Sequence, residues 1–157
     1  MKKIETITQP TSLRTWLKLA KSAGCDDKVL EIIKSDEIFR AGNSQQIVRK
    51  ISILTREELY MFSDLTSENI LVKAQQFNFS YPDAELAFHI WEDLTYKKMF
   101  ELGLSTILVM HRPVNINGKL YRLAIDRTGR VSPNRLTAIA ERPSGCWEDW
   151  FGFAFIE

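Results

Sequence analysis

Apolar residues in the first hundred positions recur with the period of an α-helix. After Thr11 and Ser12, which can cap a helix, four apolar residues are spaced as in one buried stripe: Leu13, Trp16, Leu17 and Ala20. Gly24 is expected to end this helix. The same spacing predicts five further helices, which begin near Asp26, Ser44, Thr55, Ser67 and Asp83.

Three of these predicted helices rest on specific signals. The helix near Ser44 would bury one set of apolar side chains: Ile47, Val48, Ile51 and Leu54. Thr55 and Glu58 stand three positions apart, as in a capping box, which predicts the start of a short helix. The longest predicted helix runs from Asp83 to Leu102 and is ended by Gly103.

After Gly103 the pattern changes to that of β-strands. Residues 106–114 and 119–126 are β-branched and apolar, and Asn117-Gly118 between them favours a two-residue hairpin turn. Residues 126–130 predict a second turn. Segment 133–142 fits either a helix or a strand, and Ser132-Pro133 before it favours a helix. The last predicted strand, 150–156, places three aromatic residues on one core-facing side: Phe151, Phe153 and Phe155.

This order of elements predicts an α+β fold, with an N-terminal multi-helix region packed on a small C-terminal antiparallel β-sheet. A length of 157 residues fits a single domain over 1–157, helical over about 9–103 and β-rich over about 104–157. The hydrophobic fraction of 45% and the charged fraction of 26% are those of a folded globular protein. No apolar run approaches the length of a membrane span, so we expect a soluble, cytoplasmic chain that contacts no membrane.

The two cysteines, Cys25 and Cys146, lack the paired spacing of a zinc site. We expect both thiols to be reduced, as in other cytoplasmic proteins. A single long-range disulfide is the alternative if the protein is exported. Cys146 could act as a nucleophile only with a base such as His111, and a small buried thiol is the more common role.

The predicted hairpin brings together three residues that could carry chemistry. With Asn117-Gly118 as the turn, the register sets His111 opposite Ala124 and diagonal to Arg122 and Asp126. A histidine beside a carboxylate and an arginine suits acid–base catalysis, because the carboxylate can orient the ring. The same three residues would equally form a solvated strand face with an ordinary ion pair.

Arginine dominates the β-rich part of the chain. Residues 105–142 hold seven basic and two acidic residues, although the whole chain has a net charge of only +1. The planar guanidinium suits phosphate and carboxylate groups. The candidate ligand-binding residues are Arg112, Arg122, Arg127, Arg130 and Arg135. The alternative is that these arginines discourage edge-to-edge pairing of strands.

Two other arrangements are weighed and set aside. The first two helices resemble a helix-turn-helix, but Asp26 and Asp27 open the second helix and would repel phosphate, so DNA binding is not expected. His89 has acidic residues three and four positions away, but a metal site would need ligands from a second histidine-bearing helix. We therefore expect a solvated helix face there and neither metal nor cofactor.

These observations favour a small binding or interaction module that engages a protein, an RNA or another anionic ligand through the Arg-rich β region. The alternative is a metal-independent ribonuclease that uses His111 and neighbouring arginines. In element order the chain is similar to small nuclease toxins of the barnase and RelE kind, a resemblance of fold that does not carry function.

Overall fold

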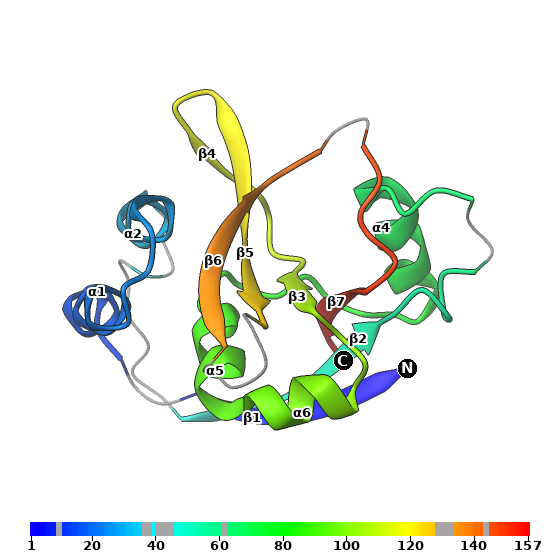
Figure 1. The fold of residues 1–157 in the computed structure, drawn as a ribbon, viewed down its shortest axis with the longest axis horizontal. Helices are drawn as coiled ribbons and strands as arrows, with labels where there is room; N and C mark the ends of the chain where they lie inside the picture. Colours follow the sequence, from blue (N-terminus) through cyan, green and yellow to red (C-terminus); the bar gives the residue numbers. More distant parts are fainter. Residues whose placement is uncertain (9–10, 36–38, 40–45, 61–62, 128–133, 143–144) are drawn as a thin grey trace.

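The computed structural model describes residues 1–8, 11–35, 39, 46–60, 63–127, 134–142 and 145–157 (Figure 1). In these residues five helices and seven strands form a mixed α+β fold. The helices are α1 (Leu13–Ser22), α2 (Asp27–Ser35), α4 (Ser67–Gln76), α5 (Leu86–Asp93) and α6 (Tyr96–Glu101). The strands are β1 (Lys2–Thr8), β2 (Ile47–Leu54), β3 (Thr106–Val109), β4 (Val114–Ile116), β5 (Lys119–Asp126), β6 (Arg135–Ala140) and β7 (Phe151–Ile156).

The seven strands form one sheet that joins the two ends of the sequence. Its order is β1-β2-β7-β3-β5-β4, and β6 pairs with the other edge of β5. All pairs are antiparallel except β3 with β7, which are parallel. The predicted α+β class is thus correct. The predicted arrangement of N-terminal helices on a C-terminal sheet is correct only in part, because β1 and β2 come from the N-terminal part of the chain.

Both faces of the sheet are covered, so alternate residues of each central strand enter different cores. One core packs against α1, α2, α5 and α6, and the other packs against α4; in Figure 1, α1 and α2 lie on the opposite side of the molecule from α4. Strand β7 supplies Ala154 to the first core and its three phenylalanines to the second. The prediction that Phe151, Phe153 and Phe155 are core residues on one face is therefore confirmed.

Local capping signals correctly marked both ends of α1 and the start of α2. The Ser12 hydroxyl accepts a hydrogen bond from the Thr15 N–H at the start of α1. An Asp26 carboxylate oxygen accepts from the Val29 N–H, 3.0 Å away, as α2 begins. Gly24, with φ of 68°, takes the left-handed conformation that ends α1.

The predicted helix near Ser44 is wrong, because residues Ile47–Leu54 form strand β2. The apolar residues of this segment fit a helical stripe, but they also fit the alternation of a strand. Three of its eight residues are isoleucine, a β-branched residue that favours strands. Pairing with β1 on one side and β7 on the other satisfies the β2 backbone and buries Ile51 and Ile53. The capping-box contact is present, with the Glu58 carboxylate accepting from the Thr55 N–H, but it closes a turn rather than a helix.

The predicted long helix from Asp83 to Leu102 is two helices, α5 and α6. Leu94 is extended, with φ of −96° and ψ of 105°, and Thr95 caps α6 by accepting from the Lys98 N–H. The Leu94 carbonyl accepts from the side-chain amide of Asn134, a long-range contact that the local pattern does not reveal.

Segment 133–142 contains strand β6 rather than the favoured helix. Six consecutive residues, Arg135–Ala140, pair with β5. Pairing with β5 therefore decided between the two conformations that the local sequence allows, helix and strand. The turn prediction at Asn117-Gly118 is confirmed, with φ values of 52° and 81° that suit the predicted type I′ turn. The predicted turn at 126–130 extends beyond the described residues.

Candidate functional site

His111 lies in an interruption between two strands that share one edge of β5. The predicted pairing of Val114 with Tyr121 is confirmed, but residues 110–113 leave the ladder, and Leu108 rather than His111 lies opposite Ala124. The His111 ring occupies the position beside β5 where neither β3 nor β4 pairs with it. Its Nε2 accepts a hydrogen bond from the Leu123 N–H at 2.8 Å, and its Nδ1 lies 2.6 Å from the Arg112 carbonyl oxygen. Because a backbone N–H can only donate, Nε2 must be the acceptor and carries no proton. In the neutral ring the proton is therefore on Nδ1.

This environment favours a structural role for His111. The side chain is 1% exposed, and burial lowers its pKa to about 4. The ring is therefore neutral at physiological pH, and both its nitrogens are engaged with the backbone. Acid–base catalysis needs a ring nitrogen that can reach a substrate.

Arg122 is buried in a network between the sheet and the start of α4. Its Nη1 donates to the Glu141 carboxylate at 2.8 Å, and the other Glu141 oxygen accepts from the Ser67 hydroxyl. Ser67 in turn accepts from the indole N–H of Trp147 at 3.0 Å. Burial lowers the pKa of Arg122, and the carboxylate of Glu141 opposes that shift. With 4% of its surface exposed, Arg122 links core elements and presents little surface to a ligand.

Asp126 lies apart from His111 and Arg122. It stands four residues beyond Arg122 on β5, about 13 Å along the strand. One carboxylate oxygen accepts from the Thr106 hydroxyl at 2.7 Å, and the other lies 3.8 Å from the Arg135 guanidinium. The three candidate catalytic residues therefore do not form one cluster.

The candidate ligand-binding arginines are also distributed. Arg112 is exposed in the interruption between β3 and β4, whereas Arg127 and Arg135 lie at the opposite end of β5. Arg122 is buried, and Arg130 is outside the described residues. The four arginines that the structure describes do not converge, and of the two ends of β5 we consider the Arg127 end further.

Arg127 packs on two aromatic rings of α6. Its guanidinium carbon lies 5.6 Å from the Tyr96 ring centre and 5.3 Å from that of Phe100, within the range of cation–π contacts. Phe100 is 63% exposed, so its ring is shared between Arg127 and solvent. We call Tyr96, Phe100 and Arg127 the arginine–aromatic cluster.

The start of strand β7 lies near this cluster. The Ser105 N–H donates to the Trp150 carbonyl at 3.2 Å, and the Arg127 N–H donates to the Ser105 carbonyl at 2.8 Å. These bonds extend the sheet by one residue and set Trp150, Ser105 and Arg127 in a row. Trp150 is 55% exposed. The sequence singled out Arg127, but its aromatic neighbours come from segments up to 31 positions away and gave no sequence signal.

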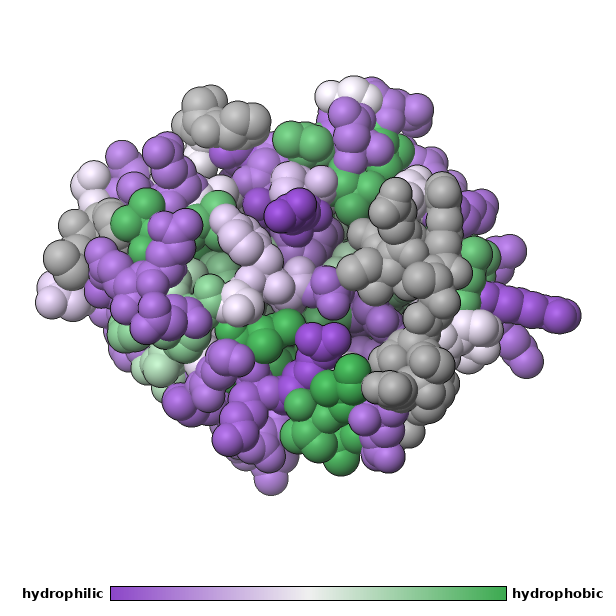
Figure 2. Space-filling view, turned by 180° about the vertical axis from the view of Figure 1, so that it is seen from behind, coloured by the Kyte–Doolittle hydropathy of each residue, from purple (hydrophilic) through white to green (hydrophobic). Residues whose placement is uncertain are grey.

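Exposed apolar residues elsewhere form separate patches. In the view of Figure 2, hydrophobic areas are divided by hydrophilic ones rather than merged into one face. Ile7 and Val48, which are paired across β1 and β2, are 46% and 62% exposed.

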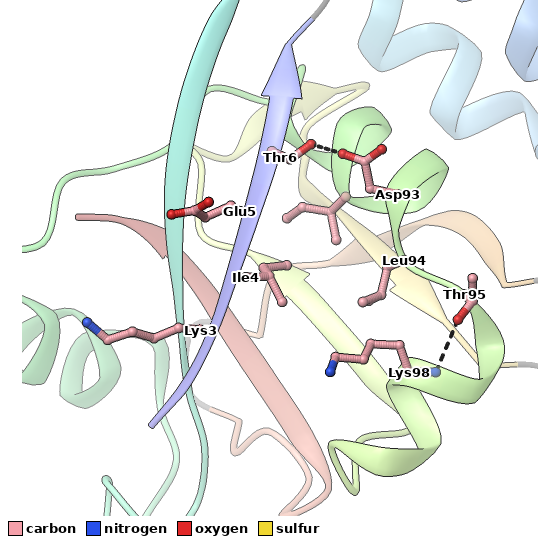
Figure 3. A pocket seen from close by; sticks show the side chains of 9 residues that line it. Lys3, Ile4, Glu5, Thr6, Asp93, Leu94, Thr95 and Lys98 are labelled. Carbon is pink, nitrogen blue, oxygen red and sulfur yellow. Dashed lines mark hydrogen bonds between the residues drawn. The ribbon is translucent and has the colours of Figure 1, made fainter.

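A pocket of about 410 Å³ lies between β1 and the junction of α5 with α6 (Figure 3). Ile4 and Thr6 point toward the helices, whereas Lys3 and Glu5 point the other way. The Thr6 hydroxyl donates to the Asp93 carboxylate at one end of the pocket, and Lys98 lies toward the other end. The sequence analysis assigned no element to the opening residues and so missed this pocket, although four of residues 2–8 are the β-branched types that favour strands.

His89 is buried rather than solvated, which corrects the expectation for that helix face. Its ring is 2% exposed and makes an edge contact with Trp16 of α1, with ring centres 5.2 Å apart. Nε2 lies 3.5 Å from a Glu85 carboxylate oxygen. The helical period alone could not reveal that α1 packs over this turn of α5.

Two further searches cover the part of the chain that the structure describes. It holds no group of three or more histidine, cysteine or acidic side chains placed to bind a metal ion. No helix in it is long and apolar enough to cross a membrane. Cys25 and Cys146 are both free thiols, and burial, followed by the charge of Asp26, raises the pKa of Cys25.

Comparisons with known proteins identify no relative. No family model matches the chain, and neither the curated proteins nor the solved structures include a significant match.

Proposed function

We propose that this chain is a binding module for single-stranded RNA, engaged at the arginine–aromatic cluster. The observation that carries the proposal is the position of Arg127 over the rings of Tyr96 and Phe100, with most of the Phe100 ring open to solvent. RNA offers both groups that such a surface can bind, an anionic phosphate and a planar base.

The chemistry of the neighbouring residues supports this choice. An exposed aromatic ring gives a stacking platform for a base, and an arginine held on that ring donates hydrogen bonds to a phosphate. Lys97 follows Tyr96 on the exposed surface of α6. Trp150 offers a further exposed aromatic ring near the same end of the sheet. Basic groups interleaved with aromatic rings are typical of single-strand binders.

The ribonuclease alternative receives no support from His111. A general base must reach the 2′-hydroxyl of the substrate, and this ring has both nitrogens bonded to backbone groups. We therefore propose binding without cleavage.

The test is the affinity for a fluorescently labelled single-stranded RNA of roughly 12 nucleotides, measured by anisotropy. Phe100→Ala should weaken binding about tenfold, because stacking on an aromatic side chain contributes ~1–3 kcal/mol per base. Arg127→Gln should weaken binding and lower the slope of log affinity against log salt by about one.

Two matched variants serve as controls. Tyr60→Ala removes another strongly exposed ring, and Arg14→Gln removes an exposed arginine of α1; neither should change the affinity. Absence of binding at about 100 µM RNA would overturn the proposal. Binding that Phe100→Ala and Arg127→Gln leave intact would also overturn it.

A further inference from the structure

Strand β1 is an edge of the sheet. It pairs with β2 on one side, and within the described chain no strand pairs with its other side. An edge strand leaves a row of backbone N–H and C=O groups that can pair with another strand. The pocket of Figure 3 lies beside this edge and opens on the side to which Ile4 and Thr6 point.

We propose that two copies of this chain associate by antiparallel pairing of their β1 strands, with Ile4 opposite Ile4 of the second copy. This interface goes beyond the proposed RNA site and uses none of its residues. The pairing is isologous, so each contact occurs twice about a two-fold axis, and the sheet continues from one copy into the other.

Charge complementarity fixes this register. Facing residues of an antiparallel pair lie on the same side of the sheet, so even positions of β1 face even positions and odd face odd. With Ile4 at the centre, Lys3 lies opposite Glu5 of the second copy, and Glu5 opposite its Lys3. Lys3 is 63% exposed and bonds Glu157 within its own chain, on the side of the sheet where Glu5 is also exposed. Two opposite-charge pairs thus flank the axis.

The neighbouring registers lack this match. A shift of one position in each strand toward the N-terminus sets Lys3 opposite Lys3 of the second copy. The same shift toward the C-terminus sets Glu5 opposite Glu5 of the second copy. Like charges directly opposite each other destabilise a strand pair. The alternation of Lys3 and Glu5 therefore selects one register from those that keep each face of the sheet continuous.

The same register suits the remaining positions of the strand. It sets Lys2 opposite Thr6 of the second copy, and the Thr6 hydroxyl is bonded to Asp93, so the Lys2 ammonium meets an acidic group. It also sets Ile7 opposite Met1 of the second copy, and these apolar side chains are 46% and 43% exposed in the single chain. The side chains of the added strand that share a face with Ile4 and Thr6 would lie beside the pocket of Figure 3.

The test exchanges charges and measures the state of association by sedimentation velocity over a range of concentrations. Lys3→Glu and Glu5→Lys should each weaken self-association about tenfold or more, because two attractive pairs become repulsive. An equimolar mixture of the two variants should recover the affinity. In that mixture one chain is acidic at both positions and the other basic at both, so every cross-pair is attractive.

Controls separate this effect from a general effect of charge. Glu157→Gln removes the intramolecular partner of Lys3 and should leave association unchanged. Lys18→Glu and Glu68→Lys change other exposed charges, on α1 and α4, and their mixture should behave as the unmodified protein does. A protein that stays monomeric at about 500 µM would overturn the proposal. So would a dimer insensitive to both β1 substitutions, or a mixture that fails to recover.

Discussion

At the scale of single residues, the polar side chains of the β-rich region serve the fold before they serve a ligand. His111 supplies the acceptor for the Leu123 N–H where the ladder between β3 and β5 is interrupted. Arg122 and Glu141 pair inside the protein and reach Ser67 of α4. An unsatisfied backbone N–H or an unpaired buried charge is costly, so both positions are constrained by stability.

The buried His111 predicts a specific loss of stability at mildly acidic pH. Its folded-state pKa of about 4 lies below the unfolded value of about 6.5, so the unfolded chain binds the extra proton. Its contribution to stability is complete above pH 6.5 and is lost as the pH falls toward 4. At pH 5 we expect a loss of about 2 kcal/mol relative to pH 7.5.

Urea unfolding of the unmodified protein and of His111→Gln, measured at both pH values, checks this. The variant should be less stable at pH 7.5 but should lose less stability on acidification. An equal loss in both proteins would show that groups other than His111 carry the pH dependence.

At the scale of elements, β7 illustrates how one strand meets two different requirements. Its phenylalanines fill the core against α4, while its alternate residues Gly152 and Ala154 are turned to the other core, beside the neighbouring strand β2. Gly152 lies at the tightest point. A Cβ atom there would lie 2.5 Å from the Ile53 Cγ2 and 2.9 Å from the Leu104 Cδ1.

Gly152→Ala is therefore expected to destabilise the protein by ~1–3 kcal/mol, although alanine suits a strand at least as well as glycine does. The cost is overpacking, so it should fall when the neighbour is made smaller. The double variant Gly152→Ala with Ile53→Ala should lose less stability than the sum of the single variants. Additive losses in the urea midpoints would mean that the backbone absorbs the extra methyl group elsewhere.

At the scale of the whole molecule, the sheet separates two cores that share the same strands. Trp16 lies in the core under α1 and α5, and Trp147 lies in the core under α4. Because β2, β3, β5 and β7 supply side chains to both cores, loss of one core should expose the sheet that supports the other.

We predict a single cooperative unfolding transition for residues 1–157. Trp147→Phe removes the fluorescent reporter of the core against α4, and the double variant Trp16→Phe with Trp91→Phe removes those of the other core, while circular dichroism follows the backbone in both. The fluorescence and dichroism midpoints should coincide within each variant, even though the two variants differ in stability. Separate midpoints would divide the chain into units that unfold independently.

The sequence alone determined the features that depend on near neighbours. Caps at Ser12 and Asp26, the Asn117-Gly118 turn and the single-faced phenylalanines of β7 follow from local hydrogen bonding, backbone sterics and alternation. These were predicted correctly because the residues that stabilise each feature lie within a few positions of it. The α+β class followed from the same local patterns.

Tertiary structure decided wherever a segment had two acceptable local conformations or met a distant partner. Residues 47–54 and 135–140 became strands because pairing with β1, β7 and β5 satisfies their backbone groups in the sheet. His111 lost its predicted neighbours because residues 110–113 leave the ladder, and this interruption shifts the register of β3 on β5, while β4 next to the turn keeps the predicted one. The Arg127 contacts and the pocket beside β1 join segments far apart in sequence, and only folding brings their complementary side chains within reach.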